Sequence, residues 1–234
     1  MEAFIYAAGR ALRLGPSYSE RPKILIEFGG RSLLEWHVLR LSEAGIKKLH
    51  VIVGHRREMI EETFPVLRDR YRVQINGIIN ADYTEGSVLS MHVSVPSLAK
   101  ATPPVFIMDG DVLYPPELFK RLVDSKHSTV MLIDRNYSTA DDDPVLVPIR
   151  QKKPVEFMKK WQGTADFVGE SIGFFKMAAA DVALMIKETN ARTEGERRRD
   201  SYDDVLRALV LAGRIDYEDV TGIPWTEIDF PSDI

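Results

Sequence analysis

The chain has 234 residues, of which 44% are hydrophobic and 28% are charged, a balance that predicts one compact domain and excludes a disordered or fibrous protein. Lys and Arg number 31 against 35 Asp and Glu, so the formal net charge of −4 lacks the basic excess that duplex nucleic-acid binding usually needs. The absence of Cys excludes disulfides, thiolate catalysis and Cys-ligated metal sites. No apolar stretch approaches about 20 residues, so neither a signal peptide nor a membrane span is expected, and a cytoplasmic location is predicted.

Apolar runs and amphipathic stretches alternate along the first half of the chain. The runs that predict strands cover residues 3–8, 49–53, 73–79, 105–108 and 129–133, and the segment 24–26 is also strand-like. The predicted helices cover residues 32–45, with a capping box at Ser32, residues 58–64 up to Pro65, residues 87–98, and a segment opened by Pro115-Pro116. This alternation is typical of a doubly wound, mainly parallel α/β sheet with helices on both faces.

The rhythm changes after about residue 134. Closely spaced strands are predicted at 145–149, 155–158 and 168–175, followed by helices at 178–189 and 202–212 and a last strand near 226–228. We expect a small antiparallel extension, with cap or acceptor-binding elements around 135–175, inside a single domain that covers residues 1–234. The run Arg197-Arg198-Arg199 is interpreted as a solvated charged loop.

Several common catalytic signatures are missing from the sequence. It contains no GxxxxGK[ST] phosphate loop, no GxGxxG fingerprint, no HExxH pair and no GxSxG elbow, which disfavours ATPases, dehydrogenases, zinc proteases and serine hydrolases. In open α/β sheets, ligands bind at the carboxyl ends of the strands. We therefore expect the site in the loops at 8–23, 80–87 and 109–114.

The loop after the first strand combines small residues with cations. The small residues Ala7-Ala8-Gly9 let backbone N–H groups approach phosphates, and the cations that follow, from Arg10 to Lys23, can neutralise a triphosphate. From the residues alone, a basic surface loop is an equally good interpretation. Likewise, Asp109-Gly110-Asp111 stands at a strand end where carboxylates would face a ligand, although an isolated pattern of this kind is more often a turn or a helix cap.

The stretch AAGRALRLGPSYSERPKILIEFGGRSLLEW resembles the N-terminal signature of the nucleotidyltransferase superfamily that makes sugar nucleotides and CDP-alcohols. In that signature AAG-x-G-x-R-L is followed by a Pro-Lys pair, a Gly-rich turn and a helix. The similarity extends over almost the whole chain, through GHRREMIEE, ADYTEGSVLSM, MDGDVLY, VGESIGFFKM, SYDDVLRAL and PWTEIDFPSDI. Arg21-Pro22-Lys23 and the closing WTEID resemble the phosphocholine cytidylyltransferase-like branch. Two departures are Ala11, in place of the second Gly, and Gly86-Ser87, where that branch often has Asn; the second leaves the base preference open.

The resemblance implies a Rossmann-like, GT-A-like fold, Mg²⁺ as cofactor, and roles for individual residues. Arg13 would stabilise the β,γ-phosphates and the departing pyrophosphate, and Lys23 would bridge the α-phosphate and the incoming phosphate. Glu227 alternates with Asp229 across Ile228, so on a strand both would point to the same face. The implied nucleotide-binding residues are Ala7, Ala8, Gly9, Arg10, Gly86 and Ser87, and the acceptor-binding residues are Lys159 and Glu170. The implied metal ligands are Asp111 and Asp229, and the face that it shares with Asp229 adds Glu227 as a candidate ligand or a neighbour of the ligands.

The implied reaction suits a chain without a His-based triad. An anionic phosphate monoester attacks the α-phosphorus of a nucleoside triphosphate, and because its second pKa lies near about 6, no strong base is required. The predicted activity is transfer of CMP from CTP to phosphocholine, aminoethylphosphonate or an inositol or polyol phosphate.

Three alternatives remain open at this point. One is a sugar-1-phosphate nucleotidyltransferase that uses UTP, GTP or dTTP. Another is a glycosyltransferase that uses the Asp109-Gly110-Asp111 motif, which would leave Arg13 and Lys23 unexplained. The third is a non-catalytic nucleotide-binding module, of which Ala11 would be a sign of decay. A homodimer through the antiparallel extension is a further candidate.

Overall fold

The computed structural model describes all residues except 16, 17, 19 and 138–143. Its strands are β1 (Glu2–Ala7), β2 (Glu27–Phe28), β3 (Arg31–Ser32), β4 (Lys48–Val53), β5 (Gln74–Ile79), β6 (Val105–Asp109), β7 (Val112–Leu113), β8 (Val130–Asp134), β9 (Leu146–Arg150), β10 (Lys153–Pro154), β11 (Phe167–Met177), β12 (Asp216–Asp219) and β13 (Thr226–Glu227). Its α-helices are α1 (Leu33–Glu43), α2 (Arg57–Glu61), α3 (Phe64–Tyr71), α4 (Val88–Leu98), α5 (Pro116–Asp124), α6 (Ala179–Asn190) and α7 (Tyr202–Leu211). Short 3₁₀ helices are η1 (Leu12–Leu14), η3 (Lys23–Leu25), η4 (Gly195–Arg199) and η5 (Pro231–Asp233).

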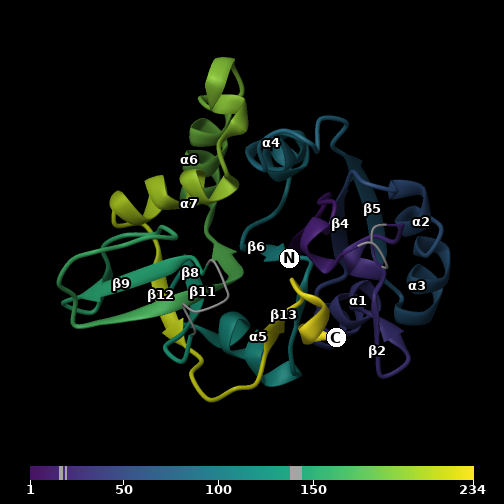
Figure 1. Ribbon diagram of the computed structural model, residues 1–234, viewed down its shortest axis with the longest axis horizontal. Coiled ribbons are helices and arrows are strands. Elements are labelled where there is room, and N and C mark those ends of the chain that lie inside the picture. The colour runs from purple at the N-terminus through teal and green to yellow at the C-terminus, as the bar shows by residue number, and fades with distance from the viewer. Residues whose placement is uncertain (16–17, 19, 138–143) are drawn as a thin grey trace.

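One large sheet organises the molecule (Figure 1). β5, β4, β1 and β6 are neighbours in this order and run parallel to one another. β11 continues the sheet antiparallel to β6 and also pairs antiparallel with β8 and β9. The predicted α/β class, a mainly parallel sheet with an antiparallel extension, is confirmed.

The hydrophobic core lies on both faces of this sheet. In β1, Ile5 packs into a cluster with residues of α1, α3 and α5, whereas Phe4 points to the opposite face and packs with residues of α4, α6 and α7. The ribbon shows the same two groups of helices on either side of the central strands (Figure 1). Burial on both faces explains why β1 and β6 are almost uniformly apolar in sequence. Within the described residues, no helix is long and apolar enough to span a bilayer.

The predicted helix boundaries hold where local chemistry fixes them. Ser32 caps α1, because its hydroxyl accepts a hydrogen bond from the Glu35 backbone N–H at 3.1 Å. Pro65, in contrast, does not simply end a helix. α2 stops at Glu61, and Pro65 lies in the first turn of α3, where its missing N–H would have no intrahelical partner anyway.

Two expectations about strands are wrong, and the strand β12 was missed. Residues 24–26 were expected to be strand-like, but η3 occupies Lys23–Leu25, because an apolar run is buried equally well by a turn that packs into the core. Residues 155–158 contribute only an isolated bridge between Leu146 and Met158. β12 was not predicted, since its sequence Asp-Tyr-Glu-Asp lacks an apolar pattern; it joins the sheet by parallel pairing with β8.

Candidate active site

The carboxyl ends of β1 and β6 lie side by side where the strand order of the parallel sheet reverses, which is where such folds bind ligands. Gly110 makes the close approach possible. Its backbone N–H donates to the Tyr6 carbonyl at 3.0 Å, and a Cβ atom there would lie 2.8 Å from the same oxygen. The turn after β6 therefore folds directly over the end of β1 and presents Asp111 beside the loop that follows Ala7.

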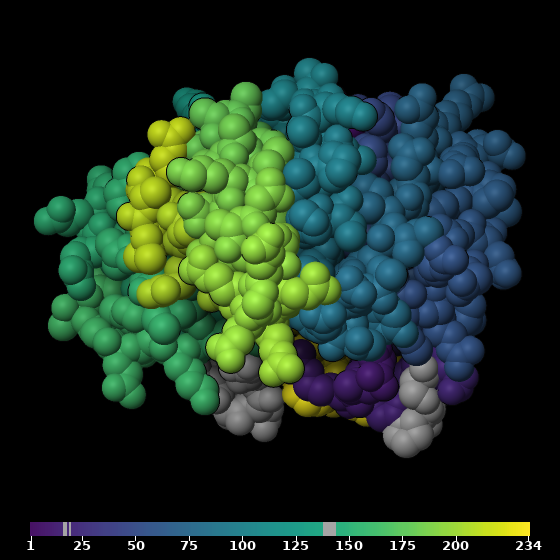
Figure 2. All heavy atoms as spheres, turned by 90° about the horizontal axis from the view of Figure 1, so that it is seen from above, coloured from purple at the N-terminus to yellow at the C-terminus, as the bar shows by residue number. Residues whose placement is uncertain are grey.

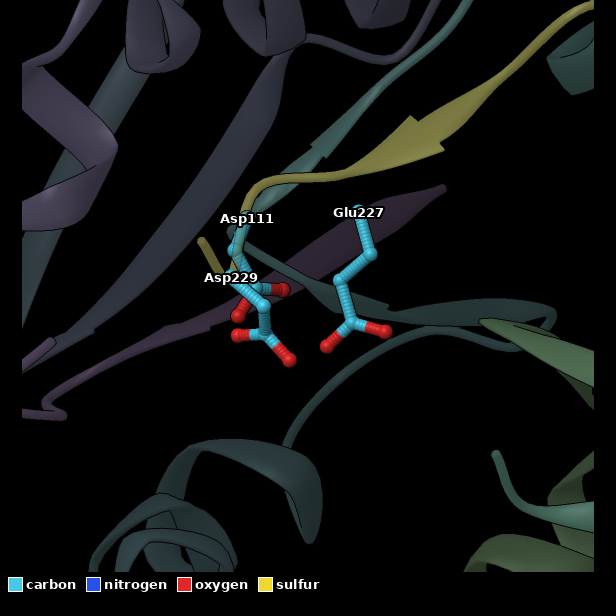
Figure 3. Close-up of side chains that lie close together, drawn as sticks. All are labelled: Asp111, Glu227 and Asp229. Atoms are coloured by element: carbon cyan, nitrogen blue, oxygen red, sulfur yellow. The ribbon is translucent and has the colours of Figure 1, made fainter. Parts of the chain in front are cut away.

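Three carboxylates meet at this point. Asp111, Glu227 and Asp229 each offer an oxygen, and these oxygens all lie within 4.8 Å of one another (Figure 3). Pairing of β13 with β7 brings the C-terminal segment here, and the Ile228 N–H donates to the Asp111 carbonyl at 2.9 Å. The residues that the sequence predicted as metal ligands thus lie together, while their role as ligands stays a prediction.

The donor set fits a hard divalent cation. Carboxylate oxygens are the ligands that Mg²⁺ and similar ions prefer. Enclosure in the cleft and the negative charges of Asp111 and Asp229 raise the pKa of Glu227 to about 8, against the weaker opposing effect of Lys23. A carboxyl group that resists ionisation because of its neighbours marks a place where an added positive charge would be stabilised.

Two cations from the N-terminal loop contact the carboxylates of this cluster. Lys23 Nζ lies 2.9 Å from Asp111 Oδ2 and 2.6 Å from Asp229 Oδ1, and the Arg13 guanidinium donates to Asp229 Oδ2. Burial alone lowers the pKa of Lys23, but the two carboxylates outweigh it, so the net shift is upward and the ammonium stays charged. Lys23 therefore sits, as an ammonium, among the oxygens that would hold a metal.

The departure at Ala11 has a visible backbone consequence. Ala11 adopts φ 52° and ψ 39°, the left-handed region, and stands directly before η1, which carries Arg13. A residue with a Cβ atom in this region is strained by roughly 1–2 kcal/mol, whereas Gly is not. The loop nevertheless reaches Asp229, so Ala11 in place of Gly does not keep Arg13 away from the carboxylates.

Pockets lie on both sides of the carboxylates. A pocket of about 420 Å³ opens between the N-terminal loop and the loop after β5; it is lined by Arg10, Ala11, Leu12, Arg13, Lys23, Tyr83, Thr84 and Asp229. On the other side, a pocket of about 120 Å³ is bounded by Lys159, Glu170 and Asp203, with Asp109, Tyr202 and Glu227 also in its wall. Arg13 and Asp229 line both pockets, so two ligands could meet at the charged cluster.

The predicted nucleotide-binding residues are only partly gathered around the larger pocket. Arg10 lines it, while Ala7 and Gly9 line a small adjoining pocket with Lys23 and Asp111. Ala8 is buried, and its carbonyl accepts a hydrogen bond from His55 N–H at 3.1 Å.

Gly86 and Ser87 lie elsewhere. The Gly86 N–H donates to the Arg198 carbonyl at 3.0 Å, and Ser87 Oγ accepts from the Tyr202 N–H at 3.0 Å. In their place Tyr83 and Thr84 form the wall of the larger pocket. The sequence analysis places the site partly in the loop at 80–87, which contains both residues, but it assigns neither of them a role.

The acceptor side contains residues that the sequence analysis passed over. The predicted residues Lys159 and Glu170 line the smaller pocket. Asp203 joins them from the first turn of α7, and burial raises its pKa while the positive charge of Lys159 opposes that shift. The SYDDVLRAL motif carries Asp203, and it was the one available signal.

Asp109 lies behind the carboxylate cluster. The Tyr202 hydroxyl donates to Asp109 Oδ1, and the Tyr202 ring stacks on Tyr6 with centroids 5.6 Å apart. Enclosure and the charge of Asp111 raise the pKa of Asp109 well above its ordinary value. Asp109 thus links β6 to α7 through Tyr202 and also lines the smaller pocket, whereas Asp111 lines the small adjoining pocket with Lys23.

Gly173 packs directly against the Asp109 side chain, and a substitution there tests this packing. Its φ is +76°, and a Cβ atom would lie 1.9 Å from Asp109 Oδ2. We expect Gly173→Ala to lower the free energy of unfolding by more than about 3 kcal/mol, because steric overlap adds to backbone strain. The matched control is Gly213→Ala, at φ +65° in open space, which should cost only the strain of about 1–2 kcal/mol. Equal losses in denaturant unfolding would show that Gly173 is not sterically required.

Residues 3–169, more than half of the chain, match the MobA-like NTP transferase domain. The chain belongs to this family. The predicted resemblance to nucleotidyltransferases is therefore confirmed. Lys23 and Asp111 lie within the matched residues, whereas Glu227 and Asp229 lie beyond them.

Curated relatives of this NTP transferase domain include cytidylyltransferases. CMP-5′-(3-aminopropyl)phosphonate synthase of Streptomyces rubellomurinus is 25% identical over 100% of this chain and 37% of that protein. The bifunctional IPC transferase and DIPP synthase of Rubrobacter xylanophilus is 29% identical over 99% of this chain and 50% of that protein, so the chain spans half or less of these two relatives. CTP:phosphoglutamine cytidylyltransferase of Campylobacter jejuni is 20% identical over 100% of this chain and 98% of that protein.

Solved structures show the same fold. The inositol-1-phosphate CTP transferase from T. maritima has a TM-score of 0.79 at 21% identity, covering 100% of this chain and 91% of that one. The CTP:phosphocholine cytidylyltransferase from Streptococcus pneumoniae has a TM-score of 0.74 at 21% identity, covering 99% and 95%. At this level of identity the likeness establishes the Rossmann-like nucleotidyltransferase architecture.

Proposed function

We propose that this NTP transferase domain is a cytidylyltransferase, which transfers CMP from CTP to a phosphorylated small alcohol or a phosphonate and releases pyrophosphate. The observation that carries the proposal is that Lys23 Nζ lies between Asp111 and Asp229, and that Asp229 and the neighbouring cation Arg13 line both pockets. This arrangement offers one compartment for each reactant and a cation at their meeting point. The relatives named for CTP-dependent reactions support CTP as the donor.

The reaction needs positioning and charge neutralisation more than proton transfer. The acceptor phosphate is already largely ionised at neutral pH, so it attacks the α-phosphorus without a general base. Lys23 would leave its carboxylate partners to neutralise the α-phosphate, and Arg13, on the wall of the larger pocket, would neutralise the β,γ-phosphates and the pyrophosphate that leaves. Asp111, Asp229 and Glu227 would hold Mg²⁺, which supplies charge neutralisation to the phosphate oxygens.

The acceptor would occupy the smaller pocket. Lys159 would meet its phosphate or phosphonate group, and Glu170 a cationic or hydroxylated head group. Both residues belong to the elements around 135–175 that we propose for acceptor binding, of which residues 138–143 lie outside the described residues. We also propose that residues 1–234 form one domain. We propose a cytoplasmic location, where nucleoside triphosphates are supplied. A homodimer stays a prediction.

A sugar-1-phosphate nucleotidyltransferase is the second candidate. Mannose-1-phosphate guanyltransferase of Emericella nidulans is 27% identical over 100% of this chain and 62% of that protein. This relative supports GTP as the alternative donor and a hexose 1-phosphate as the alternative acceptor. A glycosyltransferase is less well supported, because Lys23 and Arg13 beside the carboxylates suit a triphosphate donor.

Pyrophosphate release tests the proposal directly. Each of CTP, UTP, GTP, ATP and dTTP is combined with Mg²⁺ and a pool of phosphocholine, aminoethylphosphonate, inositol phosphate and hexose 1-phosphates. We expect release with CTP and one alcohol phosphate or phosphonate, and loss of release when the metal is removed with EDTA. Release only with another triphosphate and a hexose 1-phosphate would establish the second candidate. CTP binding without release from any combination would identify a non-catalytic module and overturn the proposal.

A further inference from the structure

Arg198 does not behave as the solvated loop residue that the sequence predicted. From η4 its guanidinium donates to both carboxylate oxygens of Glu85, through Nε at 2.9 Å and Nη2 at 3.0 Å. Nη2 also donates to Asp82 Oδ2 at 3.1 Å. Exposed ion pairs usually contribute little, but a two-pronged Arg–carboxylate contact within a network of charges is the exception.

The backbone on either side of Arg198 continues this contact. The Val88 N–H donates to the Asp200 carbonyl at 3.2 Å, in addition to the bond from Gly86 to Arg198. A Cβ atom on Gly86 would lie 2.4 Å from the carbonyl oxygens of both Arg198 and Asp200. The backbone at Gly86 is therefore in direct contact with the backbone of residues 198–200. Figure 2 shows the lime-coloured region of α6, η4 and α7 packed directly against the blue-teal region around α4.

The residues held in this way frame the larger pocket. Asp82 and Glu85 flank Tyr83 and Thr84, which form the pocket wall opposite the N-terminal loop. The other side of Tyr83 is fixed by Gly54, where a Cβ atom would lie 2.6 Å from the Tyr83 Cβ. The wall is therefore held between the end of β4 on one side and Arg198 on the other.

The same stretch of chain reaches the smaller pocket. Two to five residues after Asp200, the first turn of α7 presents Tyr202 and Asp203 to the pocket that also contains Lys159. Ser201, the N-cap of α7, lies 3.1 Å from Ser87, hydroxyl to hydroxyl. One continuous segment thus contacts the wall of one pocket and lines the other.

We propose that Arg198 is a positioning residue for the nucleotide, which fixes Tyr83 and Thr84 and neutralises Asp82 and Glu85 beside the pocket. The inference rests on the proposed function, because it takes this pocket as the triphosphate site. A polyanion approaching two uncompensated carboxylates would be repelled, and a displaced wall would lose its contacts with the nucleotide. The effect should therefore fall on nucleotide binding rather than on the chemical step.

The test compares Arg198→Ala with the neighbouring control Arg197→Ala. We expect Arg198→Ala to raise the KM for CTP about tenfold while kcat and the KM for the acceptor change by less than about twofold. Arg197→Ala should change none of these by more than about twofold. Arg198→Lys should fall between Arg198→Ala and the wild type, because it keeps the charge but loses the two-pronged contact. Adding Asp82→Asn and Glu85→Gln to Arg198→Ala should recover part of the CTP affinity.

A second readout does not depend on turnover. In the free protein, amide hydrogen exchange at residues 82–88 should be faster in Arg198→Ala than in Arg197→Ala. Unchanged exchange would show that Arg198 does not hold the loop. Faster exchange with an unchanged KM and calorimetric Kd for CTP would make the contact purely structural and overturn the positioning role. If the wild type binds CTP but releases no pyrophosphate, the proposed function fails. The Kd for CTP, compared between Arg198→Ala and the wild type, then tests the positioning role of Arg198 by itself.

Discussion

Replacing Lys23 with Met is expected to lower kcat for pyrophosphate release by about two to three orders of magnitude, the usual loss when a group that stabilises transition-state charge is removed. Met keeps the apolar stem of the side chain, so the change isolates the ammonium group. Lys23 is the cation that lies between Asp111 and Asp229, where the α-phosphate and the acceptor would meet. Initial rates at saturating CTP and acceptor measure the effect, and Lys126→Met, at an exposed position, is the control.

The same variant should bind a divalent metal more tightly when no nucleotide is present. In the free protein the Lys23 ammonium competes with a metal for Asp111 and Asp229, and its loss leaves those carboxylates to the metal. Mn²⁺ binding followed by electron paramagnetic resonance, and the increase of the melting temperature with Mn²⁺, should both be larger in Lys23→Met than in the wild type. Near-normal turnover would remove Lys23 from the mechanism, and unchanged Mn²⁺ binding would separate the lysine from the metal site.

Asp229→Asn is expected to lower the proposed metal-dependent activity by about a hundredfold or more, because it removes the charge of a proposed metal ligand while keeping the shape of the side chain. Asp229 also accepts hydrogen bonds from Lys23 and Arg13. Its backbone N–H donates to Asp233 at 2.9 Å, a contact that the substitution leaves in place. Turnover against Mg²⁺ concentration should show a lower maximum and a weaker response than in the wild type.

Nucleotide affinity separates the metal role of Asp229 from general damage. Because the substitution removes a negative charge beside the pocket, CTP binding in the presence of EDTA should be unchanged or tighter. Asp124→Asn, at an exposed salt bridge with Lys120 on α5, is the matched control and should leave both properties unaltered. An ordinary Mg²⁺ response in Asp229→Asn would contradict the proposed metal site.

Local patterns were sufficient for most of the architecture. The apolar runs of β1 and β6 lack alternation because helices cover both faces of the sheet, and Ser32 marks the start of α1 because capping is decided within one turn. Where prediction failed, the burial of the side chains was predicted correctly and the backbone conformation was not. The apolar run at 24–26, for example, is buried in the core, but η3 makes most of it a 3₁₀ turn and not a strand. Periodicity reports which side chains are buried, and over three residues it does not distinguish a strand from a turn.

The candidate site was partly visible in the sequence. Lys23, Arg13 and the three carboxylates were found because they stand in motifs that resemble a known family, and the fold gathers them at one sheet edge. The resemblance gave no role to Tyr83, Asp203 or Arg198, although Tyr83 and Asp203 stand in the matching stretches ADYTEGSVLSM and SYDDVLRAL. Their environments are created by neighbours that are distant along the chain, so no spacing within their own segments marks them.

The sequence by itself therefore determined the class of fold, the alternation of its elements and the charged groups brought to the end of β1. The tertiary structure alone decided which of those groups meet. Pairing of β13 with β7 carries Glu227 and Asp229 to Asp111, and the contact of η4 with the loop after β5 pairs Arg198 with Glu85. The physical reason is that propensity and hydrophobic period act over a few residues, whereas charge pairing depends on distances that only the completed sheet sets.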